Sequence, residues 1–409
     1  MAREMKDSGI QWVGIIPADW ECRRLRFLCE IQTGNQDTQD SVPNGLFPFY
    51  VRSPIVERSN KYTFEGPAIL MAGDGAGAGR VFHYVDGKYG CHQRVYSLQK
   101  ITDINRRFLY YYLSNLFYRE IEIANSKSTV DSVRLPMLQN FQVVFPNDHK
   151  QKKIVEYLDS KCAEIDVALD KTRTSIEEYK NLKQAIITQA VTKGMRGDRP
   201  MKESGIEWAS LIPSEWESVN PKALFSQRKE KAVPGERQLT SSQKYGIVYQ
   251  DDYMELTGSR VVVVQKDFDI LKHVEAGDFI ISMRSFQGGL EYSTKSGSIS
   301  SAYVMLVPNL NLVYPRFYRW LLKSEVYIRA LQRTSNMVRD GQAMRYSNFG
   351  QIRLYTVPLQ EQIEIADYLD EKCATLDALI DRKEKFVSEI ESYKKSLIYE
   401  YMTGKKEVY

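Results

Sequence analysis

Residues 151–192 have the sequence QKKIVEYLDSKCAEIDVALDKTRTSIEEYKNLKQAIITQAVT, and residues 362–403 repeat this stretch without a gap at a constant offset of 211. Within the repeat, Tyr157-Leu-Asp-Ser-Lys-Cys162 aligns with Tyr368-Leu-Asp-Glu-Lys-Cys373. A gap-free match of this length does not arise by chance. The sequence therefore predicts a chain built from two related halves, each ending in the same kind of segment.

Both copies have the hydrophobic pattern of an amphipathic helix. Apolar residues recur at steps of three, four or seven, and charged residues fill most positions between them. The stripe in the first copy consists of Ile154, Leu158, Cys162, Ile165, Leu169, Ile176, Tyr179, Leu182 and Ile186. The stripe in the second copy consists of Ile365, Leu369, Cys373, Leu376, Ile380, Val387, Ile390, Tyr393 and Leu397. Because neither copy contains glycine or proline before Gly194 or Gly404, we expect two uninterrupted helices that stop at these glycines.

A helix of this length needs a partner for its apolar stripe. At about 1.5 Å per residue it extends roughly 63 Å, much longer than an ordinary globular helix. The other copy carries the same stripe, so an antiparallel coiled coil would bury both and place one body at each end. Packing of each helix on its own domain is the other arrangement considered. In either case Cys162 and Cys373 are expected to be small buried residues of the stripe and not nucleophiles.

A second repeat opens each half. Residues 5–21 (MKDSGIQWVGIIPADWE) match residues 201–217 (MKESGIEWASLIPSEWE) at an offset of 196. We call these two segments the lead-ins. Their shared aromatic and proline residues are predicted to seat each body on its helix, and they are Trp12, Pro17, Trp20, Trp208, Pro213 and Trp216.

The bodies between the lead-ins and the helices are rich in short β-type runs. In the first body the predicted strands are 51–53, 68–71, 80–85 and 94–98. In the second body they are 259–264, 278–283 and 302–307. Each body also has one aromatic-rich helix candidate, at 107–116 and 316–324. The predicted fold class is α+β, with two similar mixed α/β domains separated by the two helices in a pseudo-twofold repeat. The predicted limits are 1–147, 148–197, 198–357 and 358–409.

Composition limits the function classes. The 409 residues suffice for two domains, and 56 basic against 52 acidic residues give a net charge of +4, so any nucleic-acid surface must be local. Five cysteines form no CxxC pair and no even disulfide set, which favours a reducing compartment. The N-terminus lacks an apolar signal stretch and no run is long enough to cross a bilayer, so we expect a cytoplasmic protein without membrane contact.

The familiar catalytic and cofactor motifs do not occur. Gly73-Asp-Gly-Ala-Gly-Ala-Gly79 loosely resembles a dinucleotide loop, but the residues after it are predicted to form a strand where such a loop requires a helix. There is no GxxxxGK[ST] segment, no Asn/Asp-Pro-Pro-aromatic segment and no GxSxG segment. The four histidines, His83, His92, His149 and His273, have no partner at metal-ligand spacing. We therefore expect no catalytic, cofactor or metal site in this chain.

Polar and basic loops recur at matching places in both bodies and are the candidate DNA contacts. Arginine pairs with guanine and glutamine with adenine in the major groove, and glycine allows close backbone approach. A solvated turn that carries an arginine is the plainer explanation of any one loop, and recurrence in both halves favours DNA. The candidates in the first body are Arg80, Lys88, His92, Gln93, Arg94, Lys127, Ser128 and Arg134. Those in the second body are Arg284, Ser285, Gln287, Ser300, Ser301, Tyr303, Arg339 and Arg345.

The doubled lead-in, together with the tail that ends Gln184-Ala-Ile-Ile-Thr-Gln-Ala-Val-Thr-Lys-Gly194, resembles the specificity subunits of Type I restriction-modification systems over essentially the whole chain. The resemblance implies two target-recognition domains that each read half of a bipartite DNA site, and helices that set the unread spacer. It also implies two methyltransferase subunits that bind S-adenosylmethionine, and restriction motor subunits that use ATP and Mg. The second tail departs from the pattern, because it ends Ile398-Tyr-Glu-Tyr-Met-Thr-Gly404. A coiled-coil scaffold whose end domains bind proteins is the alternative function.

Overall fold

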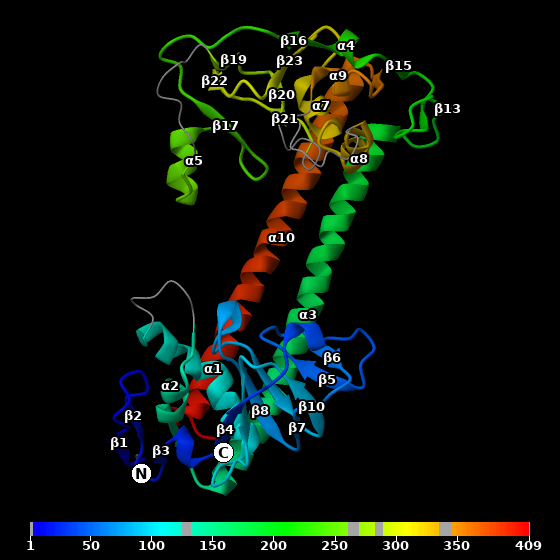
Figure 1. Ribbon diagram of the computed structural model, residues 1–409. Coiled ribbons are helices and arrows are strands. Elements are labelled where there is room, and N and C mark those ends of the chain that lie inside the picture. The colour runs from blue at the N-terminus through cyan, green and yellow to red at the C-terminus, as the bar shows by residue number, and fades with distance from the viewer. Residues whose placement is uncertain (1–2, 125–131, 261–269, 283–288, 335–344, 409) are drawn as a thin grey trace. The chain divides into compact units, whose positions relative to one another are not determined.

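The computed structural model describes residues 3–124, 132–260, 270–282, 289–334 and 345–408. The chain divides into two compact units, 1–173 with 384–409 and 174–383. Each unit contains one body, one lead-in and part of both long helices (Figure 1). The units divide each long helix between them, and the domain limits given above remain predictions.

Unit 1 is a mixed α/β structure. Its strands are β1 (Met5–Asp7), β2 (Ile15–Pro17), β3 (Glu21–Arg24), β4 (Glu30–Thr33), β5 (Phe47–Tyr50), β6 (Glu57–Ser59), β7 (Phe64–Glu65), β8 (Ala68–Ala72), β9 (Phe82–Val85), β10 (Lys88–Cys91), β11 (Val95–Gln99) and β12 (Gln142–Phe145). Its helices are η1 (Leu25–Phe27), η2 (Thr38–Asp40), η3 (Gly75–Gly77), α1 (Arg106–Ala124), α2 (Leu135–Asn140) and the first part of α3 (Asp148–Lys193).

Unit 2 repeats this plan. Its strands are β13 (Met201–Glu203), β14 (Leu211–Pro213), β15 (Glu217–Val219), β16 (Phe225–Arg228), β17 (Leu239–Ser242), β18 (Gly246–Tyr249), β19 (Lys272–Val274), β20 (Phe279–Ile281), β21 (Glu291–Tyr292), β22 (Gly297–Ile299), β23 (Val304–Pro308) and β24 (Leu354–Thr356). Its helices are α4 (Pro221–Leu224), α5 (Gln250–Thr257), α7 (Pro315–Leu321), α8 (Glu325–Thr334), α9 (Tyr346–Phe349) and part of α10 (Leu359–Met402).

The central sheet has the same order in both units. Antiparallel strands run β4-β11-β8-β9 in unit 1 and β16-β23-β20-β21 in unit 2. Since successive strand residues point to opposite faces, each central strand contributes to two cores. Ile69 and Met71 of β8 enter the main core of unit 1, whereas Ala68 and Leu70 enter a smaller core on the other face. The sheet is thus covered on both sides in each unit.

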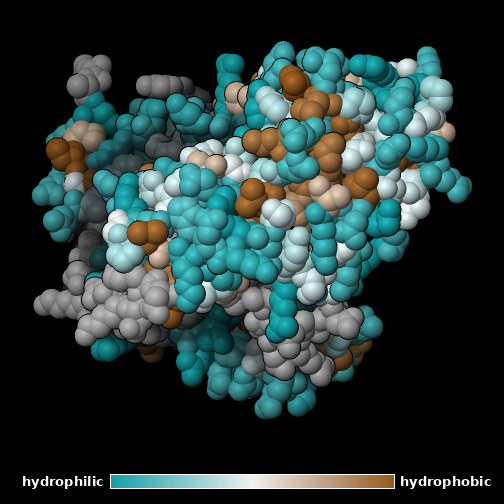
Figure 2. All heavy atoms as spheres, turned by 90° about the horizontal axis from the view of Figure 1, so that it is seen from above, coloured by the Kyte–Doolittle hydropathy of each residue, from teal (hydrophilic) through white to brown (hydrophobic). Residues whose placement is uncertain are grey.

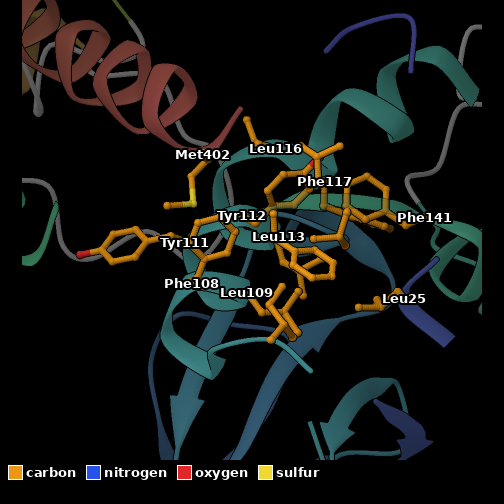
Figure 3. Packing of buried hydrophobic residues seen from close by; sticks show 14 of the residues in the cluster. Leu25, Phe108, Leu109, Tyr111, Tyr112, Leu113, Leu116, Phe117, Phe141 and Met402 are labelled. Carbon is orange, nitrogen blue, oxygen red and sulfur yellow. The ribbon is translucent and has the colours of Figure 1, made fainter. Parts of the chain in front are cut away.

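Helix α1 fills the main core of unit 1. Phe108, Leu109, Tyr112, Leu116 and Phe117 recur with helical spacing and are all buried. Figure 3 shows these side chains gathered with three others from distant parts of the chain, Leu25, Phe141 and Met402. Because Met402 lies at the end of α10, the first body and the last helix share one core.

Both long helices form as the repeat predicts. The observed helices Asp148–Lys193 and Leu359–Met402 include the two apolar stripes, and Gly194 and Gly404 adopt left-handed φ values of 71° just after them. Cys162 and Cys373 are buried at 5% and 1% exposure, as expected for stripe residues. Two assignments to the stripe were wrong, since Leu182 and Tyr393 are exposed. Next to Leu182, Lys183 forms an ion pair with Asp377 of α10.

Within each unit, α3 and α10 lie side by side in opposite directions. In unit 1, Asp166 pairs with Lys394 at 2.6 Å, and the rings of Tyr157 and Tyr401 lie 4.7 Å apart. Since Tyr157 precedes Asp166 while Tyr401 follows Lys394, the two segments are antiparallel. In unit 2, Lys183 pairs with Asp377 at 2.6 Å and Arg196 pairs with Glu364 at 3.3 Å. The segments are therefore antiparallel in unit 2 as well.

The lead-ins pack as expected. Trp20 and Trp216 are buried at 2% and 0% exposure, and each is part of the main core of its unit. A Cβ atom added to Gly404 would lie 2.6 Å from Pro17, and one added to Gly194 would lie 3.5 Å from Trp216. The lead-in of each unit therefore contacts the end of a long helix.

Within the described part of the chain, no helix is long and apolar enough to span a membrane. The side chains on the face shown in Figure 2 are mostly hydrophilic, with one gathering of hydrophobic residues.

Candidate nucleic-acid interface

The glycine loop that follows β8 is held tightly against the body of unit 1. Gly79 has φ +59°, and a Cβ atom there would lie 2.1 Å from the side chain of Ile121. A Cβ atom at Gly77 would lie 2.4 Å from the carbonyl oxygen of Arg52. Strand β9 begins at Phe82, which confirms that a strand and not a helix follows this loop. The glycines therefore serve close packing of the loop on its neighbours.

Asp74 in this loop fixes two arginines. Its carboxylate accepts a hydrogen bond from Arg52 at 3.0 Å and another from Arg94. Burial opposes ionisation, but these two hydrogen bonds and the two positive charges lower the pKa of Asp74 overall. Arg94 itself is 61% exposed. The ion pair thus holds an exposed guanidinium in a defined direction while leaving most of its N–H groups to solvent.

The turn between β10 and β11 presents Gln93 beside Arg94. Both residues are exposed, and Gln93 Nε2 donates to Asp37 Oδ2 at 3.3 Å. Asp37 also caps η2, where its side chain accepts from the backbone N–H of Thr38 at 2.7 Å. The two side chains with the strongest base-reading chemistry in unit 1 are therefore adjacent, and each is anchored by a separate carboxylate.

His92 differs from the expectation that it contacts DNA, because its side chain is buried at 2% exposure. Its Nδ1 accepts a hydrogen bond from the backbone N–H of Arg94 at 3.0 Å, and its Nε2 lies 3.4 Å from Asp37 Oδ1. The residue thus supports the turn from inside. Its contact with Asp37 joins residues 55 positions apart in the chain, so the local sequence could not indicate it.

The second polar loop of unit 1 meets the glycine loop. Ser132 forms a β-bridge with Asp74, and the backbone N–H of Val133 donates to the carbonyl of Gly73 at 2.8 Å. Arg134 follows, exposed, at the N-terminus of α2. The structure therefore brings together three segments that are distant in sequence, 73–80, 92–94 and 132–134. Lys127 and Ser128 lie outside the described residues.

Lys88 and Arg80 are two further exposed candidates of unit 1. Lys88 lies at the opposite end of β10 from the turn, 4.0 Å from Glu65 and 4.9 Å above the ring of Tyr62. Arg80 lies in the turn that precedes β9. Lys88 is therefore not brought together with Gln93 and Arg94.

In unit 2 the candidates are described only in part. Ser300 and Ser301 are exposed in the turn between β22 and β23, which corresponds to the Gln93–Arg94 turn. Tyr303 is half-buried, packs against the smaller core, and its backbone carbonyl accepts from Lys272 at 2.7 Å. Arg345 is exposed at the N-terminus of α9, the counterpart of Arg134 at α2. Arg284, Ser285, Gln287 and Arg339 lie outside the described residues.

Sequence reasoning missed the residues that position these contacts. Asp37, Arg52 and Asp74 are spread over 38 residues of the chain, and the local patterns around Asp37 and Arg52 do not distinguish them from ordinary loop residues. The one available signal was the position of Asp74 within the glycine cluster.

The first body matches a known protein domain. The family model described as Type I restriction modification DNA specificity domain covers residues 17–178. The specificity subunit of Type I restriction enzyme EcoDI from Escherichia coli is 27% identical over 212 residues, which are 52% of this chain and 43% of that protein. The MjaVIII specificity subunit from Methanocaldococcus jannaschii is 22% identical over 415 residues, which are 95% of this chain and 93% of that protein. Residues 17–178 therefore form a type I restriction-modification DNA specificity domain, and the chain is similar to type I specificity subunits.

A solved structure shares the fold of this chain. It comes from work on complex assembly and conformational transition of the type I restriction-modification system. The two chains are 14% identical with a TM-score of 0.67, and the match covers 95% of this chain and 98% of the other. The mixed α/β architecture of this chain is therefore shared with a solved structure over nearly its whole length.

Proposed function

We propose that this chain is the sequence-reading subunit of a type I restriction-modification complex, with no catalytic site of its own. Each body is a target-recognition domain that reads one half of a bipartite double-stranded DNA target. The observation that carries this proposal is the Gln93–Arg94 turn, in which two base-reading side chains are exposed, adjacent and anchored by Asp37 and Asp74.

In unit 1 the base contacts are assigned to Gln93 and Arg94, with Arg134 and Arg80 beside them and Lys88 as a phosphate contact. Anchoring matters because a fixed guanidinium loses little side-chain freedom when it pairs with the O6 and N7 atoms of guanine. In unit 2 the corresponding contacts are Arg284, Ser285, Gln287, Ser300, Ser301, Arg339 and Arg345. His92 positions the turn from inside and is removed from the contact set.

The two long helices act as an antiparallel coiled-coil strut that fixes the unread spacer between half-sites. The opposite directions of α3 and α10 within each unit support this arrangement. Two readers on one face of a duplex require a separation near whole helical turns, about 34 Å each, with allowance for DNA bending.

The partners follow from the same proposal. Two methyltransferase subunits dock on the helical region and bind S-adenosylmethionine. Two restriction motor subunits, where present, use ATP and Mg. No cofactor is assigned to this chain.

Methylation mapping tests the proposed function. A host that expresses this chain with its methyltransferase should carry one bipartite methylated motif, with both half-sites lost when the chain is deleted. Methylation that persists after deletion would refute the proposal. Binding of the purified complex to mixed-sequence duplex should also weaken as salt rises, because phosphate contacts release counterions. A protein-binding scaffold would bind no DNA in this assay.

A further inference from the structure

The buried tryptophan of the lead-in in unit 2 is fully satisfied. Trp216 Nε1 donates a hydrogen bond to Glu361 Oε2 at 3.0 Å. Arg199 donates to Glu361 and to Glu215, and its guanidinium lies 5.7 Å from the centre of the indole ring. Both Arg199 and Glu361 are less than 10% exposed. The indole N–H is therefore paired with a carboxylate that an arginine neutralises.

The same corner of unit 1 lacks that carboxylate. By the offsets of the two repeats, Trp20 corresponds to Trp216 and Arg3 to Arg199, but the counterpart of Glu361 is Lys150. Arg3 keeps its place, 6.0 Å from the centre of the Trp20 ring. Trp20 is 2% exposed, and its Nε1 has no hydrogen-bond partner among the residues that the structure describes. A buried donor without an acceptor is costly, so this corner is chemically incomplete.

A cavity occupies the incomplete corner. It has a volume of about 50 Å³, and its lining includes Arg3, Trp20, Lys150, Lys153, Lys406 and Glu407. A single water needs roughly 10–15 Å³ of such space, so the cavity has room for a group of several atoms. Trp20 and Lys150, the counterparts of Trp216 and Glu361, both line this cavity.

The charge around this cavity favours an anion. Arg3 lies 3.0 Å from Glu407 and 3.5 Å from Asp19, while Lys150 lies 2.6 Å from Asp19 and Lys406 lies 2.7 Å from Glu400. Lys153 has no ion pair among the described residues. Three of the four basic lining residues thus pair with Asp19, Glu407 or Glu400, and Lys153 leaves one positive charge without a carboxylate partner among the described residues.

We propose that this cavity binds a carboxylate group from outside the chain, which takes the place that Glu361 fills in unit 2. One carboxylate oxygen accepts the hydrogen bond from Trp20 Nε1, and Lys150 and Lys153 neutralise the charge. The carboxylate comes either from a small organic acid or from an acidic side chain of a bound protein.

The test follows the indole N–H signals of the full chain labelled with ¹⁵N-tryptophan, with acetate as the probe. Spectra of Trp20→Phe and Trp216→Phe assign the two resonances. Sodium acetate should move the Trp20 indole proton downfield in a saturable way relative to sodium chloride of equal ionic strength, and should leave Trp216 unmoved. A Trp20 signal that does not respond, or that responds equally to chloride, would overturn the proposal.

Substitution of Lys150 provides the matched variants. Lys150→Glu restores the arrangement of unit 2, so the Trp20 signal should move downfield in chloride alone and lose its response to acetate. Lys150→Gln keeps the side-chain length without the charge and should weaken the acetate response, which keeps the proposal testable if the first variant does not fold. An acetate response unchanged in both variants would contradict the assigned site.

Adding the methyltransferase subunit to the labelled chain distinguishes the two sources of the carboxylate. This last experiment is the only one of the three that rests on the proposed function. A Trp20 signal already in the bonded position without acetate identifies an acidic side chain of the partner. A signal that stays free and still responds to acetate identifies a small organic acid.

Discussion

The carboxylate of Asp159 on α3 accepts two hydrogen bonds from the guanidinium of Arg107 on α1, at 2.8 and 3.1 Å. The relationship recurs 211 residues later, where Arg316 of α7 donates to Asp370 of α10 at 2.6 and 3.0 Å. Asp370 also accepts from Arg319 and from Trp320. In both units, an ion pair therefore ties the aromatic helix of the body to the first turns of a long helix.

We expect Asp370→Asn to destabilise unit 2 by about 2 kcal/mol, because hydrogen bonds between charged groups contribute roughly 1.5–3 kcal/mol and three donors would lose their anion. Asp159→Asn should cost less, about 1 kcal/mol or below, since that carboxylate is 42% exposed and has fewer charged donors. Urea unfolding followed by circular dichroism measures both. An Asp159 variant that loses more than the Asp370 variant would contradict this ranking.

His273 gives unit 2 a pH-dependent contribution to stability. Burial lowers its pKa, but hydrogen bonds to Glu275 and Glu236 and the charges of these residues outweigh burial, so its pKa is raised overall. A raised folded-state pKa means that the stabilisation is complete below the unfolded value of about 6.5 and is lost as pH rises through the folded value. The urea midpoint of the wild-type chain should fall over this range by more than that of His273→Gln. Identical pH profiles would show that the pair contributes nothing.

Arg94→Ala should relax base preference at one half-site and cost roughly 1–3 kcal/mol of binding, because a bidentate contact to guanine reads one position. Asp74→Ala should relax the same half-site while strengthening sequence-independent binding, since it frees two arginines and removes a negative charge. A binding library with both half-sites varied measures this. Lys88→Ala is the matched control and should weaken all sequences equally. Loss of preference in both half-sites with Arg94→Ala would assign this residue to folding instead.

Insertion of a few residues near Thr174 in α3 should alter the gap between half-sites and leave the half-site sequences unchanged. The reason is that the proposed strut sets a length and does not read bases. Methylome sequencing of a host with the variant gives both half-sites and the gap together. An active insertion variant with an unchanged gap would refute the strut.

The long helices could be predicted closely because their stripes are periodic and two glycines mark their ends. The expected strand at 51–53 was wrong, since β5 ends at Tyr50. The expected helix 316–324 ends at Leu321, and Ser324, which immediately precedes α8, donates to the Leu321 carbonyl. Short elements of this kind depend on tertiary contacts that local patterns do not contain. The parallel pairing of β5 with β10 is another example, because it joins residues about forty positions apart.

The candidate site also contains residues that could be predicted from the sequence and residues that could not. Exposed arginines and glutamines in glycine-containing loops could be recognised by residue type. Their anchors could not, because the ion pair between Asp74 and Arg52 and the contact of His92 with Asp37 exist only after the sheet has formed.

The core of unit 1 contains Leu397, Ile398, Tyr401 and Met402 together with residues from the first body. During synthesis the ribosome must therefore make unit 2 before the first body can acquire its last hydrophobic layer. Contacts of such long sequence separation form slowly. We conclude that the core of unit 1 stays without its α10 residues until translation is nearly complete, which makes this body dependent on protection from aggregation until α10 arrives.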